Sequence, residues 1–143
     1  MCLYYSAENF RESETKRTSS PKVYEYHWKV YDVKLVNQSK IQLLTIFRNS
    51  KYNCPGVIMS DALDVKFNSW GGAIYHGIHV YTDKTTAKKA LDPGEVIVKV
   101  KCYNKDLIMI GKGNEAVYDR IEVEQDEYRR LLRNLLRRKN AKR

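Results

Sequence analysis

Apolar and polar residues alternate along several stretches of the chain, and this alternation predicts β-strands. The clearest stretch is 95–103, where Lys99 and Lys101 lie between apolar positions. Those apolar positions are Val96, Val98, Val100 and Cys102. Shorter apolar stretches at 107–110 and 116–123 flank the sequence Gly-Lys-Gly-Asn, which is typical of a hairpin turn. The middle of the chain is therefore expected to be rich in strands.

Two further stretches are expected to be strands. Residues 23–36 are rich in Val and Tyr, and their apolar parity changes at Tyr31, which predicts a bend or a bulge. Residues 71–81 are expected to form one regular strand with two distinct faces. One face would hold Tyr75, Gly77, His79 and Tyr81, and the other Ile74, His76, Ile78 and Val80. The second set is the expected core face, so His76 would be a core histidine.

Helical patterns are limited to two segments. Residues 82–91 predict a short helix capped by Thr82 or Asp83. A final helix is expected to begin at Asp126 and Glu127 and to bury one apolar stripe. The stripe consists of Tyr128, Leu131, Leu132, Leu135 and Leu136.

The start of the chain has a different character. Met1–Tyr5 is apolar enough for a short edge strand, whereas residues 6–22 mix Ser, Thr, Glu and Lys and indicate a flexible linker. The expected fold is α+β, with a mixed or antiparallel β-rich core, one short middle helix and an amphipathic basic C-terminal helix. We expect one domain over residues 1–128, with the helix and tail at 125–143 docked on it.

The net charge of +9 is concentrated at the C-terminal end of the chain. Residues 129–143 carry +8, and residues 1–128 carry only +1. Such a segment can bind nucleic acid or an acidic host protein, although cations near a helix end also complement the helix dipole. The candidate polyanion-binding residues are Arg129, Arg130, Arg133, Arg137, Arg138 and Lys139.

Several classes of protein are disfavoured. No apolar run reaches the roughly 18 to 20 residues of a membrane span, and no secretion signal opens the chain. Three cysteines without zinc-ligand spacing predict free thiols, no metal site and a cytoplasmic location. The chain has no P-loop and no HExxH motif. A nucleophilic Cys2, exposed by removal of Met1, is one further enzymatic hypothesis.

Two stretches, GIHVYTDKTTAKKA at 77–90 and GNEAVYDRIEV at 113–123, resemble signatures of one family. They are similar to the second and the closing signature of the ADP-ribosyltransferase superfamily of the diphtheria-toxin type. The resemblance implies NAD as cofactor, with Glu115 holding a ribose hydroxyl as nicotinamide leaves. His79 falls where the family has its nicotinamide-stacking Tyr, and Tyr81 comes two residues later. The family's first motif is a His-Gly pair, but no Gly follows the upstream His27.

The layout of the chain also resembles small accessory proteins of bacteriophages and large viruses. The similarity lies in the opening MCLY, the Tyr-rich first strand, the GIHVYTD strand with its following helix, and the Val/Lys strand. It implies a location in the host cytoplasm and assigns no activity.

Three functions remain open from the sequence. The first is a binding protein with a cleft for a nucleotide-like or anionic ligand. Its candidate ligand-binding residues are His79, Tyr81, Glu115, Lys99 and Lys101. The second is an NAD-dependent ADP-ribosyltransferase with Glu115 and His79 as catalytic residues. The third is a protein-interaction factor that acts through its C-terminal helix.

Overall fold

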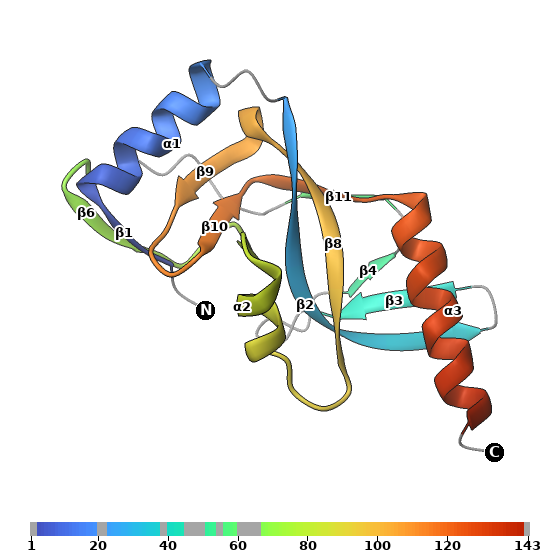
Figure 1. The fold of residues 1–143 in the computed structure, drawn as a ribbon. Helices are drawn as coiled ribbons and strands as arrows, with labels where there is room; N and C mark the ends of the chain where they lie inside the picture. Colours follow the sequence, from blue (N-terminus) through green and yellow to red (C-terminus); the bar gives the residue numbers. More distant parts are fainter. Residues whose placement is uncertain are drawn as a thin grey trace.

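The chain folds into an α+β structure, as the alternation predicts (Figure 1). The computed structural model describes residues 3–19, 23–37, 40–44, 51–53, 56–59 and 67–141. The helices are α1 (Ala7–Ser19), α2 (Lys84–Lys89) and α3 (Gln125–Ala141), with a 3-10 turn η1 (Asn104–Asp106). The strands are β1 (Leu3–Ser6), β2 (Tyr24–Asn37), β3 (Lys40–Leu44), β4 (Lys51–Asn53), β5 (Gly56–Met59), β6 (Gly71–Ile74), β7 (Ile78–Tyr81), β8 (Glu95–Tyr103), β9 (Leu107–Ile110), β10 (Glu115–Tyr118) and β11 (Arg120–Val123).

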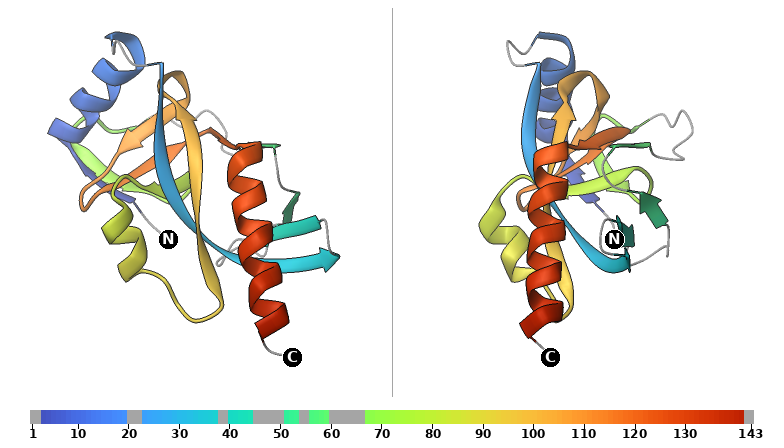
Figure 2. Two further views of the ribbon diagram at one scale, coloured as in Figure 1. Left: turned by 45° about the vertical axis from the view of Figure 1, so that its right-hand side comes forward. Right: turned by 90° about the vertical axis from the view of Figure 1, so that its right-hand side faces the viewer.

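Within the described residues, nine strands form one antiparallel sheet and two form a small second sheet. Seven strands of the large sheet follow the order β5-β11-β8-β2-β7-β10-β9, and β3 and β4 extend it beyond β2. The long strands β2 and β8 pair without interruption from Tyr24 opposite Tyr103 to Asp32 opposite Glu95. Figure 1 and Figure 2 show α1 at the β9 end and α3 alongside β8.

Two apolar clusters hold the fold together. The larger cluster includes Val98, Val100 and Tyr118 and lies on one face of the large sheet. The smaller cluster joins Leu3 of β1 to Met109 of β9 and Val117 of β10. Burial of these side chains is the main favourable term in folding. Both faces of β10 are therefore covered.

The change of parity in residues 23–36 has a structural cause. Val30 and Tyr31 are consecutive and both buried, at 7% and 0% exposure. After Asp32 strand β2 leaves β8 and continues alongside β3, with a register shift between Leu35 and Asn37. The expected bend thus coincides with a change of partner strand.

Residues 71–81 do not form the single strand that their alternation predicts. The stretch divides into β6, which pairs with β1, and β7, which pairs with β10. The break contains Gly77 at φ +88°, a conformation that side chains rarely adopt. As a result His76 is exposed, so the prediction that it is a core histidine is wrong. His79 is buried instead of outward-facing.

Residues 6–22 were expected to form a flexible linker, and this is wrong because they contain helix α1. Its start is a reciprocal cap, in which Asn9 N–H donates to Ser6 Oγ and Ser6 N–H donates to Asn9 Oδ1. The buried Ser13 then accepts from Ile110 N–H of β9 at 2.7 Å. Few apolar residues are needed for this contact, which is why periodicity does not detect the helix.

The other two helices agree with the sequence patterns. Asp83 caps α2 by accepting from Thr86 N–H, and Ala87 beneath it is fully buried. In α3, Leu131 joins the larger cluster, with Tyr128, Leu132 and Leu135 packed around it. The apolar stripe of the C-terminal helix is thus docked on the sheet.

Candidate functional site

One row of side chains crosses four neighbouring strands of the large sheet. Glu115 on β10 lies opposite Tyr81 on β7, and Tyr81 lies opposite Trp28 on β2. Trp28 in turn lies opposite Lys99 on β8. Directly opposite residues of antiparallel strands point to the same face. Four strands distant in sequence therefore place an acid, two rings and a cation side by side.

The Glu115 end of this row is partly withdrawn from water. Burial raises the pKa of Glu115, because a carboxylate is poorly solvated there. Burial also raises the pKa of Tyr81, and the neighbouring carboxylate of Glu115 adds to the effect. Two of the candidate ligand-binding residues, Tyr81 and Glu115, are thus direct neighbours across two strands.

The histidines do not complete a shared site with Glu115. The side chain of His79 lies on the Glu115 face but is only 7% exposed. The missing side chain of Gly77 makes no room for a ligand, because a Cβ there would lie 2.4 Å from Val117 Cγ1. This glycine is therefore required for packing. His27 points to the opposite face of β2, where its Nε2 lies 3.1 Å from the Tyr118 hydroxyl.

A groove of about 370 Å³ lies between α3 and the Lys99 end of the row. We call it the α3 groove. Its lining combines the ring of Trp28 with leucines of α3 and with six charged side chains. The cations are Lys84, Lys99, Arg130 and Arg138, and the acids are Glu95 and Glu127. The groove thus mixes apolar with charged side chains, and its lining carries more cations than acids.

Both acids of the α3 groove are engaged by the protein. Glu95 Oε1 accepts from Asp92 N–H, and Glu127 accepts from Lys99 N–H and from Arg130 Nε at 2.6 Å. Burial alone would raise the pKa of Glu127, but the hydrogen bonds from Arg130 and Lys99 lower it below its ordinary value. Glu127 is therefore neutralised by Arg130 and Glu95 is held by a backbone N–H, while Lys84 and Arg138 of the lining are exposed.

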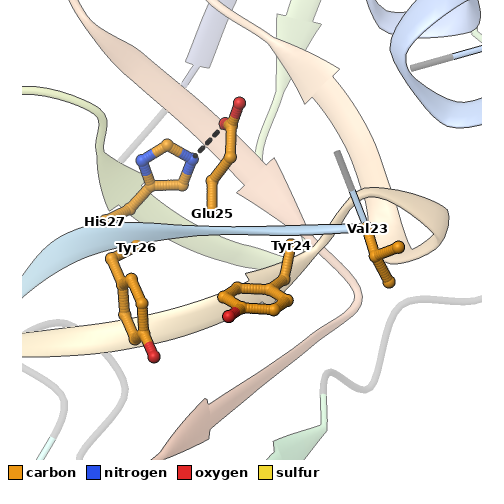
Figure 3. Close-up of a pocket in the computed structure, with 5 residues that line it drawn as sticks. All are labelled: Val23, Tyr24, Glu25, Tyr26 and His27. Carbon is orange, nitrogen blue, oxygen red and sulfur yellow. Dashed lines mark ion pairs between the residues drawn. The ribbon is translucent and has the colours of Figure 1, made fainter. Parts of the chain in front are cut away.

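A second cationic surface continues from the α3 groove along β2 and β8. We call it the tyrosine–lysine face, and it consists of Tyr24, Tyr26, Tyr103, Lys99, Lys101 and Lys105. Lys99 Nζ lies 4.8 Å from the centroid of the Tyr26 ring, and Lys101 Nζ lies 4.2 Å from that of Tyr24. Figure 3 shows Tyr24 and Tyr26 on one side of β2, with Glu25 and His27 on the other.

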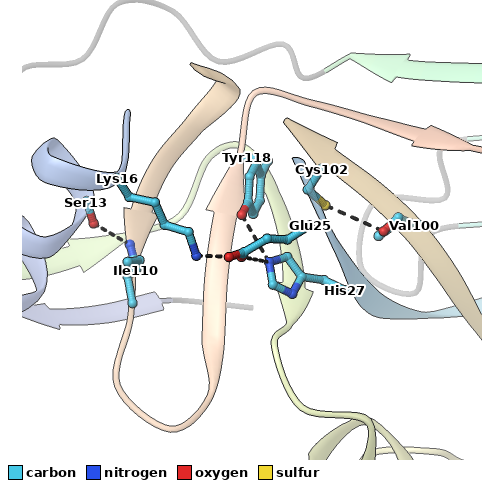
Figure 4. Close-up of polar contacts among 8 residues, drawn as sticks. All are labelled: Ser13, Lys16, Glu25, His27, Val100, Cys102, Ile110 and Tyr118. Atoms are coloured by element: carbon cyan, nitrogen blue, oxygen red, sulfur yellow. Dashed lines mark hydrogen bonds and ion pairs between the residues drawn. The ribbon is translucent and has the colours of Figure 1, made fainter. Parts of the chain in front are cut away.

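The side of β2 opposite this face carries a partly buried polar network (Figure 4). Lys16 of α1 pairs with Glu25, and Glu25 lies 3.3 Å from His27 Nε2. Burial lowers the pKa of His27, although Glu25 opposes the effect. Burial also raises the pKa of Cys102, so its thiol stays protonated. The network connects α1 to the sheet and contains no thiolate nucleophile.

The candidate polyanion-binding residues of α3 have different surroundings. Arg130 pairs with Glu127 and donates to the Ile97 carbonyl at 3.0 Å, which anchors the helix on β8. Arg129 lies 3.6 Å from Asp126. Arg133, Arg137 and Lys139 are exposed, and Arg138 is exposed at the groove. Arg130 thus has a structural role that its position in a basic segment does not reveal.

Sequence reasoning missed Trp28 and the three tyrosines of the tyrosine–lysine face. Tyr24, Tyr26 and Trp28 share a parity on one strand, as Lys99 and Lys101 do on another. Only the pairing of β2 with β8 brings the two sets together. That pairing joins segments about 70 residues apart, and no local pattern reports it.

Some expectations concern residues outside the described ranges. The nucleophile hypothesis for Cys2 falls there and receives no structural account. Among the described residues, no group of three His, Cys, Asp or Glu side chains is arranged to hold a metal ion. None of the helices in the described ranges has the length and apolar character needed to cross a membrane.

Comparison with known proteins returned no relative for this chain. We found no match to a protein-family model, to a curated protein or to a solved structure.

Proposed function

We propose that this protein is a binding module for an anionic ligand that carries an aromatic ring, of the nucleotide type. The α3 groove is the binding site. The proposal depends on the combination of the Trp28 indole ring with the cations Lys84 and Arg138 in one groove. A base can stack on Trp28 while the phosphates bind Lys84 and Arg138. The exposed cations of α3 attract the ligand over a longer range.

The groove supports this function better than the Glu115 end of the row. Small ligands bind in concave sites with an apolar base and a few polar groups. The α3 groove is concave, its apolar lining includes Trp28, Leu131 and Leu135, and its two acids are already hydrogen-bonded. By contrast, His79 is buried and Glu115 would repel a phosphate. Of the sequence-based ligand residues, Lys99 lines the groove and Lys101 lies two residues along β8.

Calorimetric titration with ATP tests the groove. Arg138→Ala and Lys84→Ala are each expected to weaken ATP binding by about tenfold, or roughly 1.4 kcal/mol, since each removes a charge-assisted contact. Arg133→Ala removes an exposed arginine of the same helix outside the groove and should leave affinity within about twofold. Equal effects of Arg138→Ala and Arg133→Ala would contradict the proposal.

Tripolyphosphate provides the complementary control for the aromatic part of the proposal. It carries the charge of ATP but has no base to stack on Trp28. We expect it to bind more weakly than ATP and to leave the indole fluorescence of Trp28 unquenched. If tripolyphosphate bound as tightly as ATP, the site would recognise the charge of the ligand and not its base.

A second candidate is NAD-dependent ADP-ribosyl transfer, favoured by the direct pairing of Tyr81 with Glu115. Against it, His27 lies on the opposite face of β2 from this pair. Incubation with labelled NAD and cell lysate tests the candidate. Transfer of label that is lost in Glu115→Gln would support the enzyme, and no transfer would eliminate it.

A further inference from the structure

The tyrosine–lysine face has the geometry of a surface for stacked rings. Tyr24, Tyr26 and Trp28 occur at every second residue of β2 and point to one face. Tyr103 of β8 lies opposite Tyr24, with their ring centroids 6.1 Å apart. Tyr24 is 44% exposed, so its ring is available to an incoming group. The rings thus follow a line that begins beside the α3 groove.

A cation accompanies each tyrosine along this line. Lys99 lies over Tyr26, Lys101 over Tyr24, and Lys105 at 5.8 Å from the centroid of Tyr103. Rings and ammonium groups therefore alternate across two strands. A ligand that fits this order must repeat both aromatic groups and negative charges.

The acid of β2 nearest these rings does not oppose such a ligand. Glu25 points to the other side of the strand from Tyr24 and Tyr26 (Figure 3). All three residues are among those that line a hollow at this end of β2, whose lining consists of Val23–His27. Glu124 lies beside the face, with its carboxylate 3.8 Å from Lys101 Nζ, and Glu122 of β11 lies directly opposite Lys101. Both acids partly neutralise that lysine and so moderate affinity.

We infer that the tyrosine–lysine face binds single-stranded nucleic acid, whose bases stack on the tyrosines while its phosphates meet the lysines. Base–aromatic stacking beside a cationic track is the general mode of single-strand binding, and it tolerates any sequence. A duplex hides the faces of its bases, and an acidic peptide lacks the repeated rings. This inference rests on the proposed function, since it extends nucleotide binding from the groove to a chain of nucleotides.

Fluorescence anisotropy with a labelled oligothymidylate of about 12 nucleotides tests the inference. Tyr24→Ala is expected to weaken binding at least about tenfold, because it removes the most exposed ring of the face. Tyr4→Ala is the matched control, since Tyr4 is 62% exposed on β1, away from the face. Equal affinities of Tyr24→Ala and wild-type protein would overturn the inference.

Two further measurements identify the ligand class. With three lysines at the phosphates, raising salt from about 50 to 200 mM should weaken oligonucleotide binding about twentyfold. Glu124→Gln should strengthen binding, because it removes one of the two acids beside Lys101. Duplex DNA of the same sequence, or anionic lipid vesicles, bound more tightly than the single strand would overturn the inference. A parallel titration with oligouridylate compares RNA with DNA. Binding of either single strand supports the inference.

ATP titrations separate this inference from the proposed function. Tyr24→Ala should keep the wild-type affinity for ATP, because Tyr24 is not part of the α3 groove. Retained ATP binding without oligonucleotide binding would overturn only the single-strand inference. The opposite result would be a protein that does not bind ATP but binds the oligonucleotide, with no effect of Arg138→Ala. It would overturn the proposal that the α3 groove binds nucleotides.

Discussion

At the scale of single residues, Gly77 illustrates how one position separates two strands. Its φ of +88° excludes a regular strand through residues 71–81, and its missing side chain gives room to Val117. A functional glycine beside a ligand and a packing glycine beside a valine look identical in sequence. Only the Cβ distance of 2.4 Å distinguishes them.

Gly77→Ala is expected to destabilise the protein by about 2 to 4 kcal/mol. Roughly 1 kcal/mol comes from the positive φ and the rest from overpacking against Val117. Gly94→Ala is a matched control, because Gly94 has the same φ of +88° and no atom within 4 Å of its Cβ. Urea unfolding measures both. A similar loss in the two variants would show that backbone strain alone is responsible.

His27 makes stability depend on pH in a range where few other groups titrate. Its pKa is lowered by burial from 6.5, so the unfolded chain takes up a proton more readily than the folded one. The surrounding groups are Lys16, Glu25, Tyr118 and Cys102. Stability is therefore expected to be full above pH 6.5 and to fall as the pH drops below it.

Thermal unfolding between about pH 7.5 and 5.5 tests this dependence. His27→Gln should flatten the decline in midpoint temperature, although it costs some stability at every pH. His76→Gln changes an exposed histidine and should keep the wild-type profile. A steep decline that persists in His27→Gln would assign the effect to another group.

At the scale of elements, the local sequence predicts a helix or strand correctly where one residue type or one apolar period dominates the segment. β8 and α3 follow their apolar periods, and α2 is capped by Asp83, one of the two predicted caps. Helix α1 was not predicted because Phe10 is its one residue in the smaller apolar cluster, while Ser13 and Arg17 hold it by bonds to backbone groups of β9. Such contacts leave no apolar period in the sequence.

Helix α3 is expected to depend on the buried carboxylate of Glu127. Glu127→Gln should lower the free energy of unfolding by about 1 to 3 kcal/mol, because it weakens the bonds to Lys99 and Arg130. Asp126→Asn, at the fully exposed neighbour, should change it by less than about 0.5 kcal/mol. Urea unfolding and limited proteolysis of α3 measure the difference.

The same carboxylate gives α3 an acid sensitivity of defined sign. Because the pKa of Glu127 is lowered below 4.5 in the folded protein, its contribution is present above that pH and is lost as the pH falls further. Glu127→Gln should remove this dependence. An unchanged acid transition in the variant would show that α3 is held by its leucines alone.

At the scale of the whole molecule, the sequence predicted the α+β class. It also shows that the positive charge is concentrated in residues 129–143. Of the residues predicted to share a cleft, Tyr81 and Glu115 lie opposite each other on neighbouring strands, and their role in binding stays a prediction. The tyrosine–lysine face was not predicted because it needs β8 to lie beside β2, and the α3 groove because it also needs α3 to lie alongside β8. Both depend on long-range pairing, whereas composition and period report local order.

The concentration of positive charge on α3 is expected to set the rate at which the protein associates with its ligand. Arg133, Arg137 and Lys139 are exposed and do not line the α3 groove, so they act on a polyanion mainly through their field. Replacing all three by Gln preserves helix propensity. The triple variant is expected to bind oligothymidylate about tenfold more slowly at low salt, with little change in the dissociation rate.

Stopped-flow measurements over a range of salt concentrations distinguish this field from direct contact. The association rates of the triple variant and the wild type should converge as salt screens the charges, since the Debye length falls to roughly 3 Å near 1 M. A dissociation rate that rises as much as the association rate falls would instead place these residues in contact with the ligand. Sedimentation of both proteins provides the last control. A wild-type dimer that dissociates in the triple variant would mean that α3 binds a second copy, and the slower association would then reflect lost self-association.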